Sequence, residues 1–150
     1  MDELDKKILK VLQEDARLSY TKIAKRVGTS TATVSDRVRR LEKSGMIKGY
    51  SVILNSSKIG ITTLIAIICV KPLFSAREIG KKIAELRETC YVYNITGDFD
   101  LIASFKCFSL TEREECKSII DKINKIDGIE RINTYIVLDT IKEESQIGWL

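Results

Sequence analysis

The sequence contains no histidine, and only one proline and one tryptophan, among its 150 residues. Without histidine, no Ser-His or Cys-His nucleophile pair can be built, and the commonest metal ligand is missing. The cysteines Cys69, Cys90, Cys107 and Cys116 are widely spaced and form no C-x-x-C pair, unlike the ligands of a structural zinc site. We therefore interpret them as small apolar residues of strands and helix faces, and we expect no metal site, no cofactor and no enzyme.

Long apolar runs are also missing. The longest run, residues 61–70, has about ten residues, whereas a transmembrane helix needs about 20. Its isoleucine, valine and threonine content predicts a buried strand instead. The chain begins with acidic residues and shows no apolar leader, so we expect a cytoplasmic protein without a membrane partner.

The positive charge is concentrated in the first third of the chain. Residues 1–57 hold 12 Lys and Arg against 7 Asp and Glu, whereas residues 58–150 hold 13 against 14. A basic segment of this kind is where a nucleic-acid contact would lie, although so small an excess is weak evidence by itself.

The first 28 residues carry the pattern of two short helices. Asp2 can cap a helix that ends near Glu14 and has its apolar residues at helical spacing. Ser19 can cap a second helix, which Gly28 ends at a position that requires a positive φ. A three-residue turn then leads to a helix capped by Ser30, so the three segments form a helix-turn-helix.

The third helix has one apolar and one polar face. Val34, Val38 and Leu41 share the inner face, and the outer face is small-sided at its start and basic along its length. Such a helix suits a major groove, with small hydroxyl side chains near the bases and Arg and Lys near phosphates. The candidate DNA-binding residues are Ser30, Thr31, Thr33, Asp36, Arg37, Arg39, Arg40 and Lys43.

A basic helix can also be only a solvated surface, and for an isolated helix that would be the better interpretation. Here the helix follows a capped helix-turn-helix and precedes residues 44–50, whose glycine predicts a helix stop leading into a short strand or wing. This context favours double-stranded DNA as a partner.

The pattern changes after a linker near residues 55–60. We predict strands over residues 61–70, 91–96, 101–107 and 129–140, and helices over 75–88 and 111–126, the second capped by Thr111 with Glu114. This order is βαββαβ, the ferredoxin-like arrangement. Because the strand over 61–70 is apolar on both faces, the sheet face away from the helices needs a cover, and we expect at least a dimer.

Three segments together resemble the Lrp/AsnC (leucine-responsive, feast/famine) family of regulators, namely residues 4–9, 23–28 and 37–48. The resemblance covers essentially the whole chain. The predicted fold class is α+β, with a winged helix-turn-helix domain over residues 1–50, a linker over 51–60, and a ferredoxin-like effector and oligomerisation domain over 61–150. The resemblance also implies dimers that assemble further, commonly into an octamer of four dimers.

Taken without the family resemblance, the loop over residues 96–100 has the Gly-Asp sequence of an ordinary turn between two strands. The resemblance implies an amino acid effector bound there, between subunits. Backbone N–H groups near Gly97 could hold its carboxylate, and a loop aspartate could accept its ammonium group. The implied effector-binding residues are Thr96, Gly97, Asp98 and Asp100, with Asn133, Thr134 and Tyr135 from the facing subunit.

The function expected is that of a sequence-specific DNA-binding transcription regulator whose activity or assembly responds to a small effector. Two alternatives are weaker. A protein-interaction module would show weak or salt-insensitive DNA binding. A small-molecule enzyme on the ferredoxin-like domain would need catalytic groups, and the sequence has neither histidine nor a phosphate-binding loop.

Overall fold

The chain forms two compact units. The computed structural model describes residues 1–108 and 113–143. The first unit takes in Met1–Ile53 and the second Leu54–Ile141. Among the described helices, none has the length and apolar character that crossing a membrane requires.

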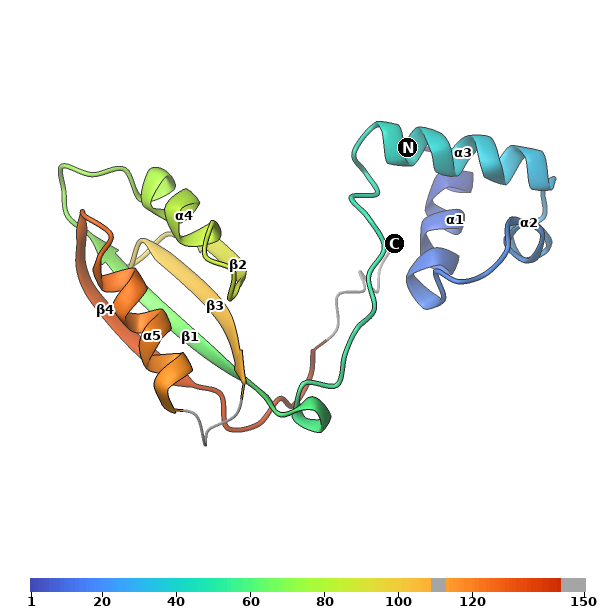
Figure 1. Cartoon of the computed structure of the whole chain (residues 1–150). Helices are drawn as coiled ribbons and strands as arrows, with labels where there is room; N and C mark the ends of the chain where they lie inside the picture. Colours follow the sequence, from blue (N-terminus) through green and yellow to red (C-terminus); the bar gives the residue numbers. More distant parts are fainter. Residues whose placement is uncertain (109–112, 144–150) are drawn as a thin grey trace. The chain divides into compact units, whose positions relative to one another are not determined.

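The N-terminal unit is a bundle of three helices (Figure 1): α1 (Glu3–Glu14), α2 (Tyr20–Val27) and α3 (Thr31–Lys43). Each begins at its predicted cap. The side chains of Asp2, Ser19 and Ser30 accept hydrogen bonds from backbone N–H groups three residues further on. These bonds satisfy N–H groups that have no partner within the helix. The helix-turn-helix prediction is therefore confirmed.

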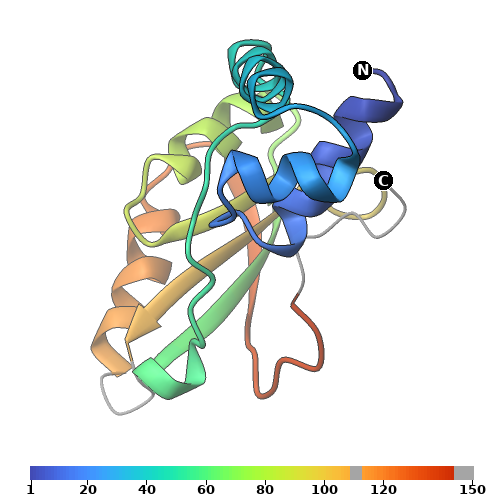
Figure 2. The same cartoon turned by 90° about the vertical axis from the view of Figure 1, so that its right-hand side faces the viewer.

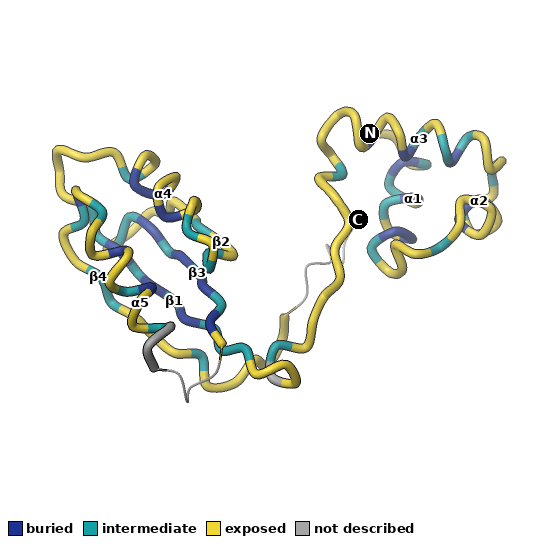
Figure 3. The backbone as a smooth tube through the Cα atoms, viewed as in Figure 1, coloured by how far each residue is buried: buried dark blue, intermediate teal, exposed yellow. Residues whose placement is uncertain are grey.

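The core of this unit lies where the helical spacing of apolar residues predicts it. Ile8 of α1, Ile23 of α2, and Val34 and Val38 of α3 are all fully buried. In Figure 3 parts of α1, α2 and α3 are coloured as buried, and much of the rest of this unit is coloured as exposed. Burying each such side chain stabilises the fold by about 1.5–3 kcal/mol, which holds the three short helices together.

The segment after α3 differs from the prediction. Gly45, with φ 74°, follows the helix as expected, and Ile47 packs against the core. Residues 46–55 then form no strand, so the short strand predicted here is wrong. A strand needs a neighbour to hydrogen-bond with, and no described segment of this unit offers one.

The C-terminal unit is a four-stranded antiparallel sheet with helices on one face (Figures 1 and 2). Its elements are η1 (Ser57–Ile59), β1 (Ile61–Val70), α4 (Ala76–Ala84), β2 (Thr89–Asn94), β3 (Leu101–Phe108), α5 (Arg113–Asn124) and β4 (Ile129–Ile136). The strand order is β2-β3-β1-β4. The predicted α+β class and βαββαβ order are confirmed.

Alternation along the two central strands separates the two faces of the sheet. In β1 and β3 every second residue is buried beneath the helices, with Ala66 opposite Ala103 and Leu64 opposite Phe105. Ile83 of α4 belongs to the same core. The core therefore lies between the central strands and the two helices.

The other sheet face carries several large apolar side chains and faces away from both helices. Ile65 and Ile67 lie on it, with Ile67 opposite Ile102. Tyr91 and Tyr93 of β2 stack on each other with ring centroids 6.1 Å apart, and each is about half exposed. No described segment of this unit covers the face. Below, the name open sheet face refers to this surface.

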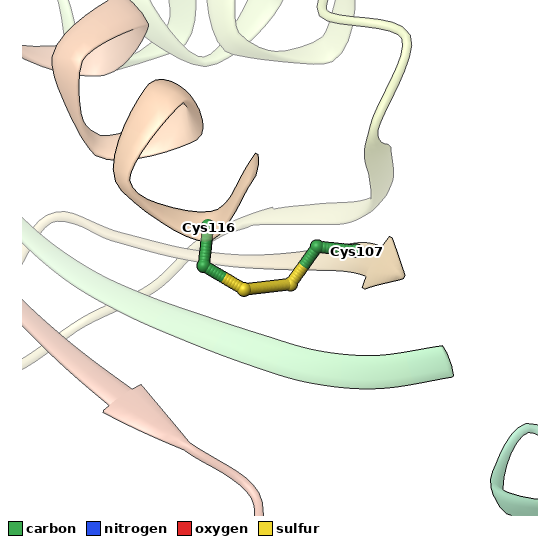
Figure 4. The surroundings of a disulfide bond; sticks show 2 residues. All are labelled: Cys107 and Cys116. Carbon is green, nitrogen blue, oxygen red and sulfur yellow. A yellow bond between two sulfur atoms is a disulfide. The ribbon is translucent and has the colours of Figure 1, made fainter. Parts of the chain in front are cut away.

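Two of the four cysteines are joined. Cys107 at the end of β3 and Cys116 of α5 form a disulfide bond, with their Cα atoms 5.9 Å apart (Figure 4). The prediction that the cysteines are small apolar residues of strands and helix faces did not foresee this bond, although Cys107 does lie in the core. Their spacing could not reveal it, because the register of α5 on β3 decides whether the sulfurs meet. Cys69 and Cys90 are free.

Several element boundaries also differ from the prediction. The helix predicted over 75–88 ends at Ala84, because the chain turns so that the Thr89 hydroxyl donates to the Ile83 carbonyl at 2.7 Å. The strand predicted over 91–96 consequently begins earlier, at Thr89. The last strand ends at Ile136 rather than at residue 140. The predicted cap at Thr111 lies outside the described residues.

Candidate DNA-binding and effector sites

The turn between α2 and α3 sets how the recognition helix leaves the bundle. Gly28 has φ 73°, a backbone angle that residues other than glycine rarely adopt. A Cβ atom added there would meet no neighbouring atom within 4 Å, so the backbone angle alone favours glycine. The N–H groups of Gly28 and Thr29 both donate to the Ala24 carbonyl, at 2.9 and 3.0 Å. These two hydrogen bonds to one carbonyl end α2, and Ser30 then caps α3, which begins at Thr31.

The start of α3 presents small hydroxyl side chains. Ser30 Oγ accepts from the Thr33 N–H at 3.0 Å and lies 2.8 Å from Thr33 Oγ1. Ser30 and Thr31 are exposed, and Thr33 is half-buried. Because Ser30 is engaged as a cap, its hydroxyl is fixed in place, whereas Thr31 keeps its side chain available to solvent.

The outer face of α3 carries four of the predicted DNA-binding residues in exposed positions: Asp36, Arg39, Arg40 and Lys43. Arg39 and Asp36 form a loose ion pair at 3.9 Å, with both side chains 76% exposed. A pair this exposed contributes little to folding and can be exchanged for another partner. The face is therefore a solvent-exposed, mainly basic surface.

Arg37 has a different environment from the other basic residues of α3. Its Nη1 donates to the carboxylates of Asp2 and Asp5, the latter at 3.1 Å, and its side chain is only 24% exposed. The hydrogen bond from Arg37 lowers the pKa of Asp2 to about 2, and the two carboxylates raise the pKa of Arg37. Asp5 is the only buried charged residue in the described part of the chain.

Sequence reasoning missed this ion-pair cluster, which we call the Arg37 clamp (Asp2, Asp5 and Arg37). The spacing of Asp2 and Asp5 indicates a helix cap, and the structure shows a capping box there. Their basic partner lies more than 30 residues away along the chain. Only the packing of α1 against α3 brings the three side chains together.

The loop over residues 95–100 is tied to β1 by Asp100. The Asp100 carboxylate accepts from the Val70 N–H at 2.7 Å, and the Asp100 N–H donates to the Ile68 carbonyl at 3.0 Å. Thr96, Gly97 and Asp98 are exposed, and Gly97 has φ 122°. Asp100 thus shapes the loop, while Asp98 presents its carboxylate to solvent.

The three predicted residues of β4 lie on both faces of the sheet. Asn133 and Tyr135 are opposite Ile67 and Ile65, which places them on the open sheet face, whereas Thr134 is opposite Ala66 on the helix-covered side. The single chain therefore brings Asn133 and Tyr135 to one surface of the sheet and Thr134 to the other.

A residue beside the loop was not singled out from the sequence. Arg131 of β4 lies opposite Cys69, its Nη2 is 3.6 Å from Cys69 Sγ, and its guanidinium lies 5.5 Å from the centroid of the Phe99 ring. A cation over an aromatic face is attracted by the ring quadrupole. The pairing of β1 with β4 brings Arg131 to this place, and no local pattern in the sequence predicts that pairing.

A cavity of about 330 Å³ lies at the other end of β3 from this loop. Its described lining residues are Arg87, Glu88, Lys106, Phe108 and Ser118. Lys106 donates to Thr63 and Ser56, and Lys122 pairs with Glu88, whose pKa it lowers. Within the described ranges, no group of His, Cys, Asp and Glu side chains is arranged to hold a metal ion.

A helix-turn-helix is a DNA-binding motif, and here it is followed by a separate ferredoxin-like α+β domain. Comparison with known families agrees at both ends. Residues 1–42 match the AsnC-type helix-turn-helix domain, and residues 65–147 match the Lrp/AsnC ligand binding domain. The chain belongs to the Lrp/AsnC family.

Relatives along the whole length are regulators as well. The chain is 38% identical over 150 residues to an uncharacterized HTH-type transcriptional regulator of Pyrococcus abyssi, covering 98% of each chain. It is 33% identical to the HTH-type transcriptional regulator FL11 of Pyrococcus horikoshii, covering 98% of this chain and 95% of that one. These relatives identify the chain as a DNA-binding transcriptional regulator of the Lrp/AsnC type.

Solved structures show the same fold. AsnC of Escherichia coli matches with a TM-score of 0.78 and 28% identity, covering 97% of each chain. A transcriptional regulator of Neisseria meningitidis, solved as a complex with L-Met, matches with a TM-score of 0.83 and 22% identity, covering 97% of this chain and 94% of that one.

Proposed function

We propose that this protein is a sequence-specific transcription regulator whose DNA binding or assembly responds to an amino acid bound between subunits of the C-terminal domain. The observation that carries the DNA-binding part is the exposed outer face of α3, with hydroxyl side chains at its start and basic side chains further on. The ligand-binding family match supports the second part.

In this proposal the start of α3 enters the major groove. Thr31 and Thr33 contact base edges or thymine methyl groups, and Ser30 keeps the helix start in shape. The cations of the outer face, Arg39, Arg40 and Lys43, bind phosphates. Asp36 balances Arg39 in the free protein and leaves that pair when a phosphate takes its place.

Two copies of the chain are needed for tight binding to a two-fold symmetric DNA site. We propose that the open sheet face is the dimer interface. Its apolar side chains, among them Ile65, Ile67 and Ile102, would otherwise form an exposed apolar patch, which a monomer rarely maintains. Dimers of this kind can assemble further into the octamer expected for the family.

The proposed effector site is the loop over residues 96–100, completed by a facing subunit. Gly97 leaves backbone N–H groups open to a carboxylate, and Asp98 accepts the ammonium group. Asp100 positions the loop through its bond to Val70. From the facing subunit Asn133 and Tyr135, which share the open sheet face, contribute side chains, whereas Thr134 lies on the opposite face of β4 and is left out of the proposed site. The L-Met complex of the Neisseria meningitidis regulator supports an amino acid as the ligand class.

The DNA-binding part is tested by selection from a pool of random duplexes with the purified protein. We expect one recurring, two-fold symmetric sequence to be enriched. Its affinity should fall steeply with salt, and Arg40→Ala should reduce the slope of log K against log salt by about 0.9 per subunit. Failure to enrich any sequence, together with salt-insensitive binding, would contradict the proposal.

The effector part is tested by thermal unfolding in the presence of each of the twenty amino acids. A ligand at about 100 times its Kd stabilises the bound protein by about 2.7 kcal/mol. We expect one or a few amino acids to raise the melting temperature and Asp98→Ala to abolish that rise. If no amino acid changes the melting temperature, the effector part of the proposal is contradicted, and the protein is a regulator that does not respond to amino acids.

A further inference from the structure

The Arg37 clamp holds one of the positively charged side chains of α3 in ion pairs within the N-terminal unit. Arg37 is one of the four Arg and Lys residues in α3, yet its Nη1 is held by two carboxylates of the first turn of α1. The Asp5 side chain is 3% exposed and that of Asp2 52% exposed, so one acid is inside the unit and the other is at its surface. Helix capping does not need a charged side chain, because Asn caps a helix as well as Asp does.

The clamp lies beside the surface that α3 offers to DNA. Arg40, one turn after Arg37, has its Nη2 3.8 Å from Asp5 Oδ2 while its side chain remains 67% exposed. Arg37 follows Asp36 in sequence and lies on the flank between the core residues and the exposed face. A phosphate that approaches this flank competes with the carboxylates for the same guanidinium, because both anions can accept two parallel hydrogen bonds from arginine.

We propose that Asp2 and Asp5 are specificity-determining residues of the DNA-binding surface. They hold Arg37 as an internal ion pair and keep it out of the set of side chains that bind phosphates. Phosphate contacts carry no sequence information, so each one that is withheld lowers binding to all DNA while base contacts are kept. The clamp thereby raises the ratio of specific to non-specific affinity. This inference rests on the proposed DNA-binding function.

A purely structural clamp makes a different prediction. If the pair only holds α1 against α3, its loss loosens the helix and weakens binding to every duplex. If the pair withholds Arg37 from phosphates, its loss strengthens binding to unrelated DNA. The two roles therefore differ in the sign of the change in non-specific affinity.

The test uses Asp2→Asn and Asp5→Asn, singly and together, in the full chain. Asparagine keeps the size of the side chain and an acceptor oxygen for the helix cap, but it removes the charge that holds Arg37. The matched control for each single variant is Glu3→Gln, which changes the net charge by the same one unit in the same helical turn. Glu3 is 81% exposed and pairs with Lys6, not with Arg37.

Binding is measured by fluorescence anisotropy against two labelled duplexes over a series of salt concentrations. One is the duplex that the wild-type protein enriches from a random pool, and the other is a scrambled duplex of the same composition. Circular dichroism under the conditions of the binding measurements checks that every variant is folded. A last variant, Asp2→Asn with Asp5→Asn and Arg37→Gln, removes the released cation itself.

For the doubly substituted clamp we expect tighter binding to the scrambled duplex and a salt slope steeper by about 0.9 per subunit, one extra phosphate contact each. In each single variant the ratio of specific to scrambled affinity should fall below that of Glu3→Gln, which carries the same change in net charge. Adding Arg37→Gln should return the slope to the wild-type value.

Three results would overturn the inference. The clamp variants could match Glu3→Gln in slope and ratio, they could lose affinity for both duplexes equally, or the steeper slope could persist after Arg37→Gln. Each of these leaves the DNA-binding function standing. If the wild-type protein binds neither duplex, the proposed function fails and the inference fails with it.

Discussion

Breaking the disulfide between Cys107 and Cys116 should lower the stability of the C-terminal unit by a predictable amount. The two residues are nine positions apart, so the bond closes a loop of about ten residues. The chain-entropy model gives about 2.7 kcal/mol at 25 °C for a loop of about ten residues. For a domain of 60–100 residues, each kcal/mol corresponds to about 4–8 °C in Tm, so we expect a decrease of roughly 10–20 °C.

The assay is thermal unfolding of the wild-type protein with and without a thiol reductant, alongside two variants. Cys116→Ala removes the half-buried end of the bond, and Cys90→Ala removes an exposed free cysteine as the control. The reductant should lower the Tm of the wild-type protein and of Cys90→Ala by the same amount. It should leave the already lowered Tm of Cys116→Ala unchanged.

Thiol titration of the unfolded, unreduced protein gives a second readout. The free cysteines are Cys69 and Cys90, so two thiols should react before reduction and all four afterwards. Four reactive thiols without reductant, or equal responses of the wild-type protein and Cys116→Ala to the reductant, would refute the reasoning.

Three further predictions concern the sheet, the effector loop and the clamp. Ile67→Lys on the open sheet face should convert a dimer to monomers in light scattering, whereas Leu73→Lys, at a 97% exposed position in the loop after β1, should not. Asp100→Ala leaves the Val70 N–H without its acceptor, which should cost about 1–3 kcal/mol in urea unfolding and weaken amino acid binding. The folded-state pKa of Asp2 is lowered from 3.8 to about 2, so its stabilising effect is complete above about pH 4 and is lost as the pH falls towards 2; NMR titration of this carboxyl should give the lower value.

The helical boundaries of the N-terminal unit could be predicted because the signals are local. Asp2, Ser19 and Ser30 each bond to an N–H only three residues away, and Gly28 takes a backbone angle that its own lack of a side chain permits. The βαββαβ order could be predicted for a similar reason. Alternation in strands and four-residue spacing in helices are properties of short segments.

Boundaries that depend on distant partners could not be predicted in the same way. The helix over residues 76–84 stops four residues earlier than its sequence pattern indicates, because the chain must turn there to pair with β3. Residues 46–55 have strand-forming composition but no strand, because pairing requires a neighbour that the described unit does not contain.

The sequence by itself determined the class of fold, the recognition helix and the apolar character of both sheet faces, since all three follow from residue type and spacing. Only the tertiary structure decided which charges of α3 are available. Helical spacing places Arg37 on the flank of α3 and Arg39 and Arg40 on its outer face, but only the structure shows that Arg37 is held by two acids more than 30 residues away. An ion pair depends on distance in space, and the packing of α1 on α3 sets that distance.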